Sequence, residues 1–364
     1  MAHVIPRTLE RYLRRDATLY PIVALTGPRQ AGKTTLARAA FPGHAYVSLE
    51  ETENRLLARD DPRGFLARLP GDAIVEEAQR APNLFSYIQT AVDAVDRPGR
   101  FVLTGSQNFL LMEQVSQSLA GRCGLLHVLP FSRAELERQE QPEPSLDGGL
   151  FANRSTGLDC WATVWSGLYP RIHDRQIPPQ VWLADYVRTY IERDVRELVN
   201  VGDLDTFERF VALCTGRTGQ ILNYSALAND CGIAVDTARR WISTLRTSFI
   251  VFLLRPHSRN FSKRLIKSPK LYFYDTGLVC YLLGIRSREQ LLLHAARGAV
   301  FENYVVAEVN KQFVHHRQES PLFFWRDQTG HEIDLLIDTG SELLAVEVKS
   351  AETINPSMLD GLVW

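Results

Sequence analysis

The sequence has few cysteines, and their spacing excludes the common cysteine-built sites. The 364 residues include five cysteines and no C-x-x-C pair, which argues against a disulfide framework or a zinc site and is typical of a reducing cytoplasm. There is no run of about 18 apolar residues, so a membrane span is not expected. The N-terminus also lacks an apolar segment suited to secretion. We therefore expect a cytoplasmic protein without a membrane partner.

The sequence also lacks a large overall excess of positive or negative charge. The formal net charge is −1, so nothing global points to nucleic acid as a partner. Residues 236–270, however, hold nine Lys or Arg side chains and one acid, Asp236, so positive charge is concentrated in one segment. The length suggests two or three domains, and an apolar content of 45% is ordinary for a globular protein.

Residues 27–35 have the pattern G-x-x-x-x-G-K-T of a phosphate-binding loop. An apolar run at 21–26 precedes them and good helix formers follow at 36–40, which is the context the motif requires, although a glycine-rich turn is the alternative. Glycines let the backbone wrap a phosphate, and exposed N–H groups attract the anion. We expect Lys33 to reach the β- and γ-phosphates and the Thr34 hydroxyl to hold Mg²⁺. The predicted ATP-binding residues are Gly27, Gln30, Ala31, Gly32, Lys33, Thr34 and Thr35.

Two acids end another predicted buried strand, at 72–77. In P-loop ATPases an acid at this point holds Mg²⁺ through water, and a following Glu can orient the attacking water. We therefore assign Glu76 to Mg²⁺, although Asp is usual there, and Glu77 to catalysis. The alternative is a solvated pair of acids at a strand end, but Lys33 upstream favours the functional interpretation.

A third buried strand is predicted at 100–105, and polar residues follow it. Ser106 or Gln107 could sense the γ-phosphate from the neighbouring strand tip. Arg122 is a second catalytic candidate, because an arginine can stabilise phosphate charge in cis or in a neighbouring copy; a structural salt bridge is the alternative. The alternation of strands and helices predicts an α/β domain with a mostly parallel sheet covered by helices.

Two flanking segments complete this part of the chain. Residues 5–15 carry apolar side chains at helical spacing with four arginines between them, Arg7 included, and predict an amphipathic helix whose charged face is solvated. Residues 139–149 are rich in Glu, Pro and Gly and have no periodicity. They predict a surface loop near a domain boundary.

Residues 223–245 predict a helix, a glycine-containing turn and a second helix, which together form a helix-turn-helix. A strand at 249–254, a basic loop at 255–270 and a strand at 271–274 would add the hairpin of a winged helix. Its second helix and wing would carry the basic cluster, a face that usually contacts phosphates. The alternative is a winged helix that packs against protein. The candidate DNA contacts are Arg239, Arg240, Lys263 and Arg264.

The last segment predicts a helix and three strands, at 298–312, 322–325, 332–338 and 343–349. Glu347 and Lys349 are two residues apart and hence share one sheet face. We expect Asp334 on the neighbouring strand and Glu302 on the helix to lie beside them. This arrangement resembles the D…E-x-K site of restriction-endonuclease-like nucleases, in which the acids bind Mg²⁺. The alternatives are an inactive site and a lysine-centred ion-pair cluster.

Taken together, these motifs resemble a bacterial and archaeal family of predicted AAA-type ATPases with a C-terminal domain of unknown function. The resemblance implies ATP binding, a winged-helix middle and a nuclease-like C-terminal fold. The chain departs from the pattern at Glu76, and it ends at Trp364 where another strand and helix are expected, so truncation is an open alternative. The matching segments are 25–30, 32–35, 103–106, 120–122, 190–194, 267–273, 275–278 and 347–350.

We divide the chain into a P-loop ATPase domain at 1–150, a helical and winged-helix domain at 151–290 and a restriction-endonuclease-like segment at 291–364. The leading hypothesis is a Mg²⁺-dependent ATPase whose nucleotide state controls a DNA-associated C-terminal half. One alternative is a non-catalytic nucleotide switch or scaffold that contacts protein only, and another is an ATP-regulated nuclease. A homo-oligomer or a protein partner is compatible with each.

Overall fold

The computed structural model divides the chain into two compact units. The N-terminal unit comprises residues 4–131 and 315–317, and the C-terminal unit comprises the described parts of 132–314 and 318–364. The structure describes residues 4–95, 97–106, 115, 118–145, 157–190, 204–257, 268–327, 330–351, 353 and 358.

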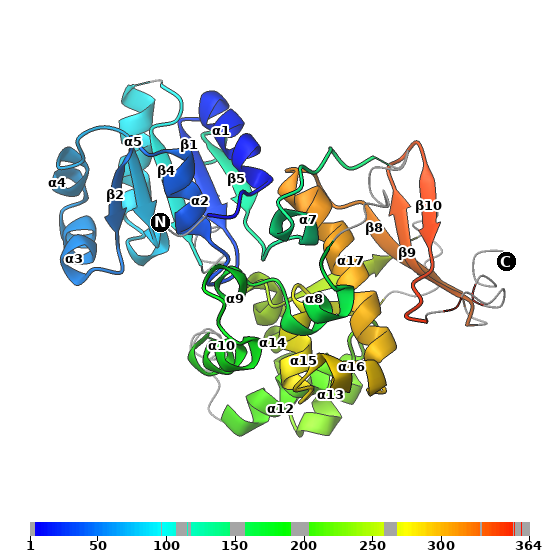
Figure 1. Ribbon diagram of the computed structural model, residues 1–364. Helices are drawn as coiled ribbons and strands as arrows, with labels where there is room; N and C mark the ends of the chain where they lie inside the picture. The colour runs from blue at the N-terminus through cyan, green and yellow to red at the C-terminus, as the bar shows by residue number, and fades with distance from the viewer. Residues whose placement is uncertain are drawn as a thin grey trace. The chain divides into compact units, whose positions relative to one another are not determined.

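A five-stranded parallel sheet forms the centre of the N-terminal unit, with the strand order β2-β3-β4-β1-β5 (Figure 1). Its central strands are runs of apolar residues buried along their whole length, as expected for a parallel sheet covered on both faces. The mostly parallel α/β fold predicted from the sequence is therefore confirmed. The strands are β1 (Ile22–Thr26), β2 (Ala45–Ser48), β3 (Ala73–Glu76), β4 (Phe101–Gly105) and β5 (Cys123–His127).

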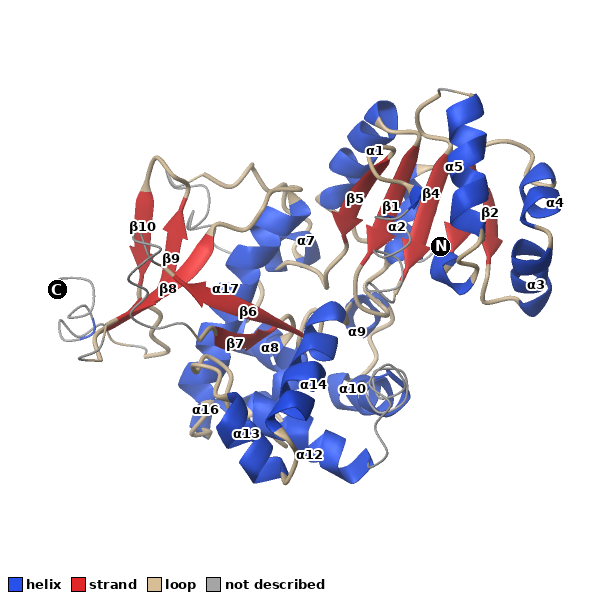
Figure 2. Cartoon of the chain, turned by 180° about the vertical axis from the view of Figure 1, so that it is seen from behind, coloured by secondary structure: helices blue, strands red, loops and turns tan. Residues whose placement is uncertain are grey.

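Helices cover both faces of this sheet (Figure 2). One apolar core joins the first two helices to Val23 and Leu25 of β1, and the other joins the fifth helix to Ile22 and Ala24 of the same strand. Side-chain alternation along β1 thus assigns its residues to two separate cores. The helices are α1 (Leu9–Leu19), α2 (Lys33–Ala40), α3 (Thr52–Asp60), α4 (Pro62–Ala67), the 3₁₀ turn η1 (Ala78–Arg80) and α5 (Leu84–Ala94).

The C-terminal unit combines helices with a second five-stranded sheet of order β10-β9-β8-β6-β7. All its pairs are antiparallel except β6 with β8. The strands are β6 (Val251–Pro256), β7 (Lys270–Phe273), β8 (Leu322–Arg326), β9 (Glu332–Asp338) and β10 (Leu343–Val346). The helices are α7 (Arg133–Leu136), α8 (Cys160–Ser166), α9 (Pro170–Asp174), α10 (Pro179–Tyr186), α12 (Leu204–Thr215), α13 (Tyr224–Cys231), α14 (Val235–Thr247), α15 (Thr276–Leu282), α16 (Arg288–Leu293) and α17 (Arg297–His315). None of the helices that the structure describes has the length and apolar character needed to cross a membrane.

Two features of this unit differ from or add to the expectations. The strands of the expected hairpin, β6 and β7, pair antiparallel, and β6 also pairs with β8, so the two strands belong to a larger sheet. The last predicted strand is also shorter than expected, because β10 ends at Val346, before Glu347 and Lys349. Which distant strands pair, and where that pairing ends, depends on tertiary structure, which sequence periodicity does not predict.

Candidate functional site

The phosphate-binding loop lies between the end of β1 and the start of α2, and two glycines fix its shape. Gly27 has φ +148°, and a Cβ there would lie 2.0 Å from the carbonyl oxygen of Val128. Gly32 has φ +91° and directly precedes α2. Both positions therefore require glycine, on grounds of backbone conformation and, at Gly27, of space.

Lys33 begins α2 and points back over the loop. Its Nζ donates to the carbonyl oxygens of Gly27 at 2.9 Å and Pro28 at 2.7 Å. Burial, together with the Arg29 charge, lowers the pKa of Lys33 to about 8, despite the raising effect of the carboxylates of Glu77 and Glu76. A buried ammonium group whose charge is only partly compensated favours the approach of an anion.

Glu76, at the end of β3, is held by three hydroxyl groups. Its Oε1 accepts a hydrogen bond from Thr34 Oγ1, and its Oε2 accepts from the Tyr46 hydroxyl and from Ser48 Oγ, the last at 2.8 Å. Burial raises the pKa of Glu76, but these hydrogen bonds and the charge of Lys33 outweigh it, and the pKa is lowered overall. The predicted pair of Thr34 and Glu76 is thus in direct contact, with Glu76 as a carboxylate at neutral pH.

Glu77 follows in a left-handed backbone conformation, with φ 54° and ψ 42°. A non-glycine residue in this region is strained by about 1 kcal/mol, and such strain is frequent at functional sites. Its Oε2 accepts hydrogen bonds from Gln79 Nε2 at 2.6 Å and from Ser106 Oγ at 3.0 Å. Because β4 lies between β1 and β3, Ser106 stands between the phosphate loop and the acid pair. The other predicted sensor, Gln107, lies outside the described residues.

Arg122 does not fit a catalytic role within its own chain. It precedes β5, and its backbone carbonyl accepts from Ile22 N at the amino end of β1. The phosphate loop follows the other end of β1, so a parallel sheet separates the two by the length of a strand. Arg122 instead forms a bidentate salt bridge with Asp93, which was the alternative for this residue.

Arg7 is a residue that sequence reasoning assigned to a solvated face, and the structure buries it. Its guanidinium donates to the carbonyl oxygens of Ala31 at 3.0 Å and Leu129 at 2.6 Å, and it lies 4.8 Å from the Phe131 ring centroid. Arg7 therefore fixes a peptide group of the phosphate loop. The remaining predicted residues of the loop, Gln30 and Thr35, lie in the loop and in the first turn of α2 respectively.

The helix-turn-helix is present as α13 and α14, joined through Gly232 in the left-handed conformation. Trp241, Ile242 and Leu245 of α14 are buried, whereas Arg239 and Arg240 are exposed. The Arg239 guanidinium lies 4.7 Å from the centroid of the Tyr224 ring on α13. The candidate DNA contacts Lys263 and Arg264 lie outside the described residues.

The acidic cluster of the C-terminal unit is built around Lys270, the last residue of the predicted basic loop at 255–270. Lys270 Nζ lies 3.2 Å from Glu302 Oε1 and 3.8 Å from Asp334 Oδ1, and it also pairs with Glu332. The Tyr272 hydroxyl donates to Glu302 Oε1 at 2.6 Å. Burial lowers the pKa of Lys270, but the three carboxylates outweigh it and raise it overall. Lys270 is only 2% exposed, so it is a buried structural cation and not a surface contact for DNA.

Glu347 and Lys349 lie near this cluster and pair with each other. Asp334 Oδ2 accepts from the Val348 backbone N–H at 2.9 Å. Burial lowers the pKa of Lys349, but the hydrogen bond to Glu347 and the charges of Glu347, Asp334 and Glu302 raise it overall. Direct contacts thus link Glu347 to Lys349 and Asp334 to the Val348 backbone between them, and Glu302 and Asp334 share Lys270. Within the described part of the chain, no three His, Cys, Asp or Glu side chains form a group suited to a metal ion. These contacts form an ion-pair cluster, but the lysine at its centre is Lys270 and not Lys349, which was the lysine expected to offset the carboxylates.

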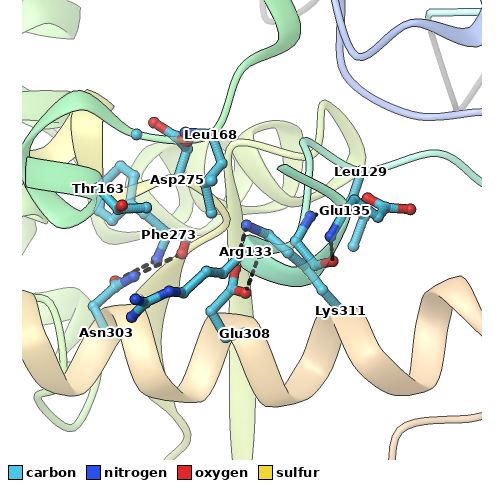
Figure 3. Close-up of polar contacts among 12 residues, drawn as sticks. Leu129, Arg133, Glu135, Thr163, Leu168, Phe273, Asp275, Asn303, Glu308 and Lys311 are labelled. Atoms are coloured by element: carbon cyan, nitrogen blue, oxygen red, sulfur yellow. Dashed lines mark hydrogen bonds and ion pairs between the residues drawn. The ribbon is translucent and has the colours of Figure 1, made fainter. Parts of the chain in front are cut away.

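Polar side chains of α17 hold other parts of the C-terminal unit together (Figure 3). The Asn303 amide brackets Phe273 of β7, accepting from its N–H at 2.8 Å and donating to its carbonyl oxygen at 2.8 Å. Glu308 accepts from the Arg133 backbone N–H at the start of α7, at 2.7 Å, and from Lys311 Nζ at 3.0 Å. Asn303 and Glu308 thus satisfy backbone donors and, in the case of Asn303, a backbone acceptor, which is a structural role.

Three models of known protein domains match successive parts of the chain. Residues 19–137 match the model of the AAA domain, residues 159–289 match a domain of unknown function (DUF8612), and residues 297–364 match a domain of unknown function (DUF4143). The first match contains the phosphate loop and the acid pair. The third contains Glu302, Asp334, Glu347 and Lys349.

Two solved structures are similar at low identity. The Walker-type ATPase PABY2304 of Pyrococcus abyssi has 15% identity and a TM-score of 0.45, with 77% of this chain and 96% of that chain covered. The Holliday junction branch migration motor RuvB of Thermotoga maritima has 18% identity and a TM-score of 0.34, with 69% and 90% covered. Similarity at this level does not bear on what this chain does.

Two mycobacterial proteins are much more similar in sequence. The uncharacterized proteins Rv2008c of Mycobacterium tuberculosis and Mb2031c of Mycobacterium bovis are each 33% identical over 359 residues, which cover 96% of this chain and 76% of each relative. Together with the domain matches, this identity shows that the chain belongs to their family, the P-loop ATPases of the AAA type with a C-terminal domain of unknown function (DUF4143).

Proposed function

We propose that the N-terminal unit binds and hydrolyses ATP with Mg²⁺, and that its nucleotide state controls a DNA-associated C-terminal unit. The observation that carries the first part is the convergence of Lys33, Thr34, Glu76 and Glu77 at the carboxyl ends of β1 and β3. Lys33 would bind the β- and γ-phosphates. The backbone N–H groups of the loop would bind the remaining phosphate oxygens.

The residues present fit a magnesium ion. The Thr34 hydroxyl and the Glu76 carboxylate are in contact, and both are hard oxygen donors of the kind that Mg²⁺ prefers. When bound with the nucleotide, Mg²⁺ neutralises charge on the transferring phosphoryl group. Glu77 lies one residue further on, with its carboxylate fixed by Gln79 and Ser106. We assign it to orienting and deprotonating the attacking water.

The Lys33→Met variant tests nucleotide binding. Methionine keeps most of the apolar stem and removes the charge, so affinity for ADP and for a non-hydrolysable ATP analogue should fall by roughly 100- to 1000-fold, the loss expected for several charge-assisted hydrogen bonds. Calorimetric titration measures this directly. The variant should remain folded by circular dichroism, because burying the Lys33 charge is itself unfavourable. Unchanged affinity would remove the proposal.

The second part, association with DNA, rests on the exposed arginines of α14. Arg239 and Arg240 lie on the solvent side of the second helix of a helix-turn-helix, and Arg246 is exposed on the same helix. Such a face suits the phosphate backbone of a duplex. Nucleotide-dependent DNA affinity would support control by the N-terminal unit. Absence of DNA binding at low salt would favour the scaffold that contacts protein only.

A further inference from the structure

The strand next to the acid pair presents two hydroxyl groups to Glu76. Ser48 is the direct neighbour of Glu76 in the parallel pairing of β2 with β3, and Tyr46 is the neighbour of Ile74. Residues two apart on a strand point to the same face, so Tyr46 and Ser48 lie on the face that α2 covers. The guanidinium of Arg38 on α2 lies 4.8 Å from the Tyr46 ring centroid, which confirms that side.

The two oxygens of Glu76 have separate partners. Oε2 accepts from Tyr46 and Ser48 of the edge strand, while Oε1 accepts from Thr34 of the phosphate loop. Ser48 is 7% exposed and Tyr46 is 40% exposed. One end of the carboxylate is thus tied to β2, and the other end faces the position at which the nucleotide and its metal are proposed to bind.

We propose that Tyr46 and Ser48 are positioning residues that orient the glutamate at this site, where an aspartate is usual, so that its Oε1 stays aligned with Thr34. The inference rests on the proposed function. A glutamate side chain has one more rotatable bond than aspartate, so fixing it costs more conformational entropy. Two hydroxyl donors on one oxygen select a single orientation of the carboxylate in advance, and this preorganisation favours metal binding.

Preorganisation by β2 has a consequence that a merely structural contact does not share. Aspartate is one methylene shorter, so in a Glu76→Asp variant the carboxylate lies further from the Tyr46 hydroxyl. Removing that hydroxyl should then have little further effect. The energetic coupling between positions 46 and 76 is therefore the diagnostic quantity.

The experiment measures ADP affinity by calorimetry, once with Mg²⁺ and once with EDTA, for the wild type, Tyr46→Phe, Glu76→Asp and the double variant. In Tyr46→Phe the gain in affinity from Mg²⁺ should shrink about 3- to 10-fold, the effect of one hydrogen bond to a partly exposed carboxylate. Affinity in EDTA should stay unchanged. Ser48→Ala should act in the same direction. Tyr87→Phe is the matched control, because Tyr87 is 39% exposed and lies on α5, which covers the other face.

A second measurement needs no nucleotide. Melting temperatures of the same four proteins should show coupling between Tyr46 and Glu76, because the hydrogen bond exists in the free protein. One result would show that the contact is only structural and would overturn the proposal. In that result, the melting temperatures show coupling between Tyr46 and Glu76, but Tyr46→Phe does not change the gain in ADP affinity from Mg²⁺. An equal effect of Tyr46→Phe in the Glu76→Asp background would also overturn it. A wild-type protein that binds no nucleotide would instead overturn the proposed function, and the melts would still report the contact.

Discussion

Two buried lysines of this protein lie beside carboxylates, but their pKa values are shifted in opposite directions. Lys33 donates to two backbone carbonyl oxygens, and burial lowers its pKa to about 8. Lys270 is surrounded by Glu302, Glu332 and Asp334, and these carboxylates raise its pKa despite burial. The first lysine has charge to offer to an incoming anion. The second is already neutralised by its own chain.

This difference indicates a binding role for Lys33 and a structural role for Lys270. A lysine inside a cluster of carboxylates stabilises the fold, and those carboxylates are correspondingly less available to a metal ion. A lysine that is hydrogen-bonded to carbonyl oxygens and only partly compensated by nearby carboxylates carries an unfavourable buried charge that a phosphate would relieve. The comparison therefore predicts that substitutions at the two sites affect different measurements.

The largest expected effect is on turnover at the first site. Glu77→Gln should slow ATP hydrolysis by about 100- to 10,000-fold, the usual contribution of a general base, while the affinity for ATP changes little. Steady-state turnover and calorimetry measure the two quantities. Glu53→Gln, an exposed glutamate on α3, is the matched control. If Glu76→Gln stops turnover and Glu77→Gln does not, the roles of the two acids are reversed.

The next effect is on stability at the second site. Lys270→Met leaves three carboxylates without their central cation and should lower the free energy of unfolding by about 2 to 4 kcal/mol. The Lys270→Arg variant keeps the charge and should lose less of the free energy of unfolding. Denaturant unfolding of both variants measures the two losses. Nucleotide affinity should not change. A Lys270→Met protein as stable as the wild type would show that the cluster does not stabilise the fold.

The site around Lys33 is better predicted from the sequence than the cluster around Lys270, for a physical reason. The phosphate loop, the acid pair and the parallel sheet follow from residues close together in the chain, and their positions agree with expectation. Tyr46, Ser48 and Arg7 were not identified as parts of the site, because their contacts depend on which strands and loops become neighbours. A polar alternation on the strand at 45–48 is the only local signal that could have suggested two of them.

Lys270 shows the same limit more strongly. Its position after a basic loop suggested a surface contact, but its partners come from α17 and β9, more than 30 residues later in the chain. Glu347 and Lys349 were expected on a strand, and β10 ends before them. Local periodicity cannot show which carboxylates a buried lysine will meet, because tertiary contacts decide this.

A smaller effect is expected for the exposed arginines of α14. Replacing Arg239 and Arg240 by alanine should weaken duplex DNA binding about 10-fold at low salt and lower the slope of log affinity against log salt by about 2, one unit for each lost phosphate contact. Fluorescence anisotropy over a range of salt concentrations measures both. Arg59 and Arg63, exposed on α3 and α4, supply the control pair. Equal losses in both pairs would indicate non-specific attraction only.

The smallest expected effect is the uptake of a fraction of a proton per protein when nucleotide binds. Since the pKa of Lys33 is about 8 in the free protein and a bound phosphate would raise it, nucleotide binding at a pH of about 8.5 should take up protons. Unfolding also takes up protons between about pH 8 and 10.5, so the contribution of Lys33 to stability becomes more favourable as the pH rises through that window. Calorimetry in two buffers of different ionisation enthalpy counts the protons. Identical binding heats in both buffers would contradict the lowered pKa.

The contrast between the two lysines is tested most directly by the shift in melting temperature that Mg²⁺ and nucleotide produce in Lys33→Met and Lys270→Met. Ligand that binds only the folded protein raises the melting temperature. We predict a shift for Lys270→Met as large as that of the wild type and no shift for Lys33→Met, with only Lys270→Met melting lower in the absence of ligand. A full shift in Lys33→Met, or its loss in Lys270→Met, would contradict the assignment of binding to one lysine and structure to the other.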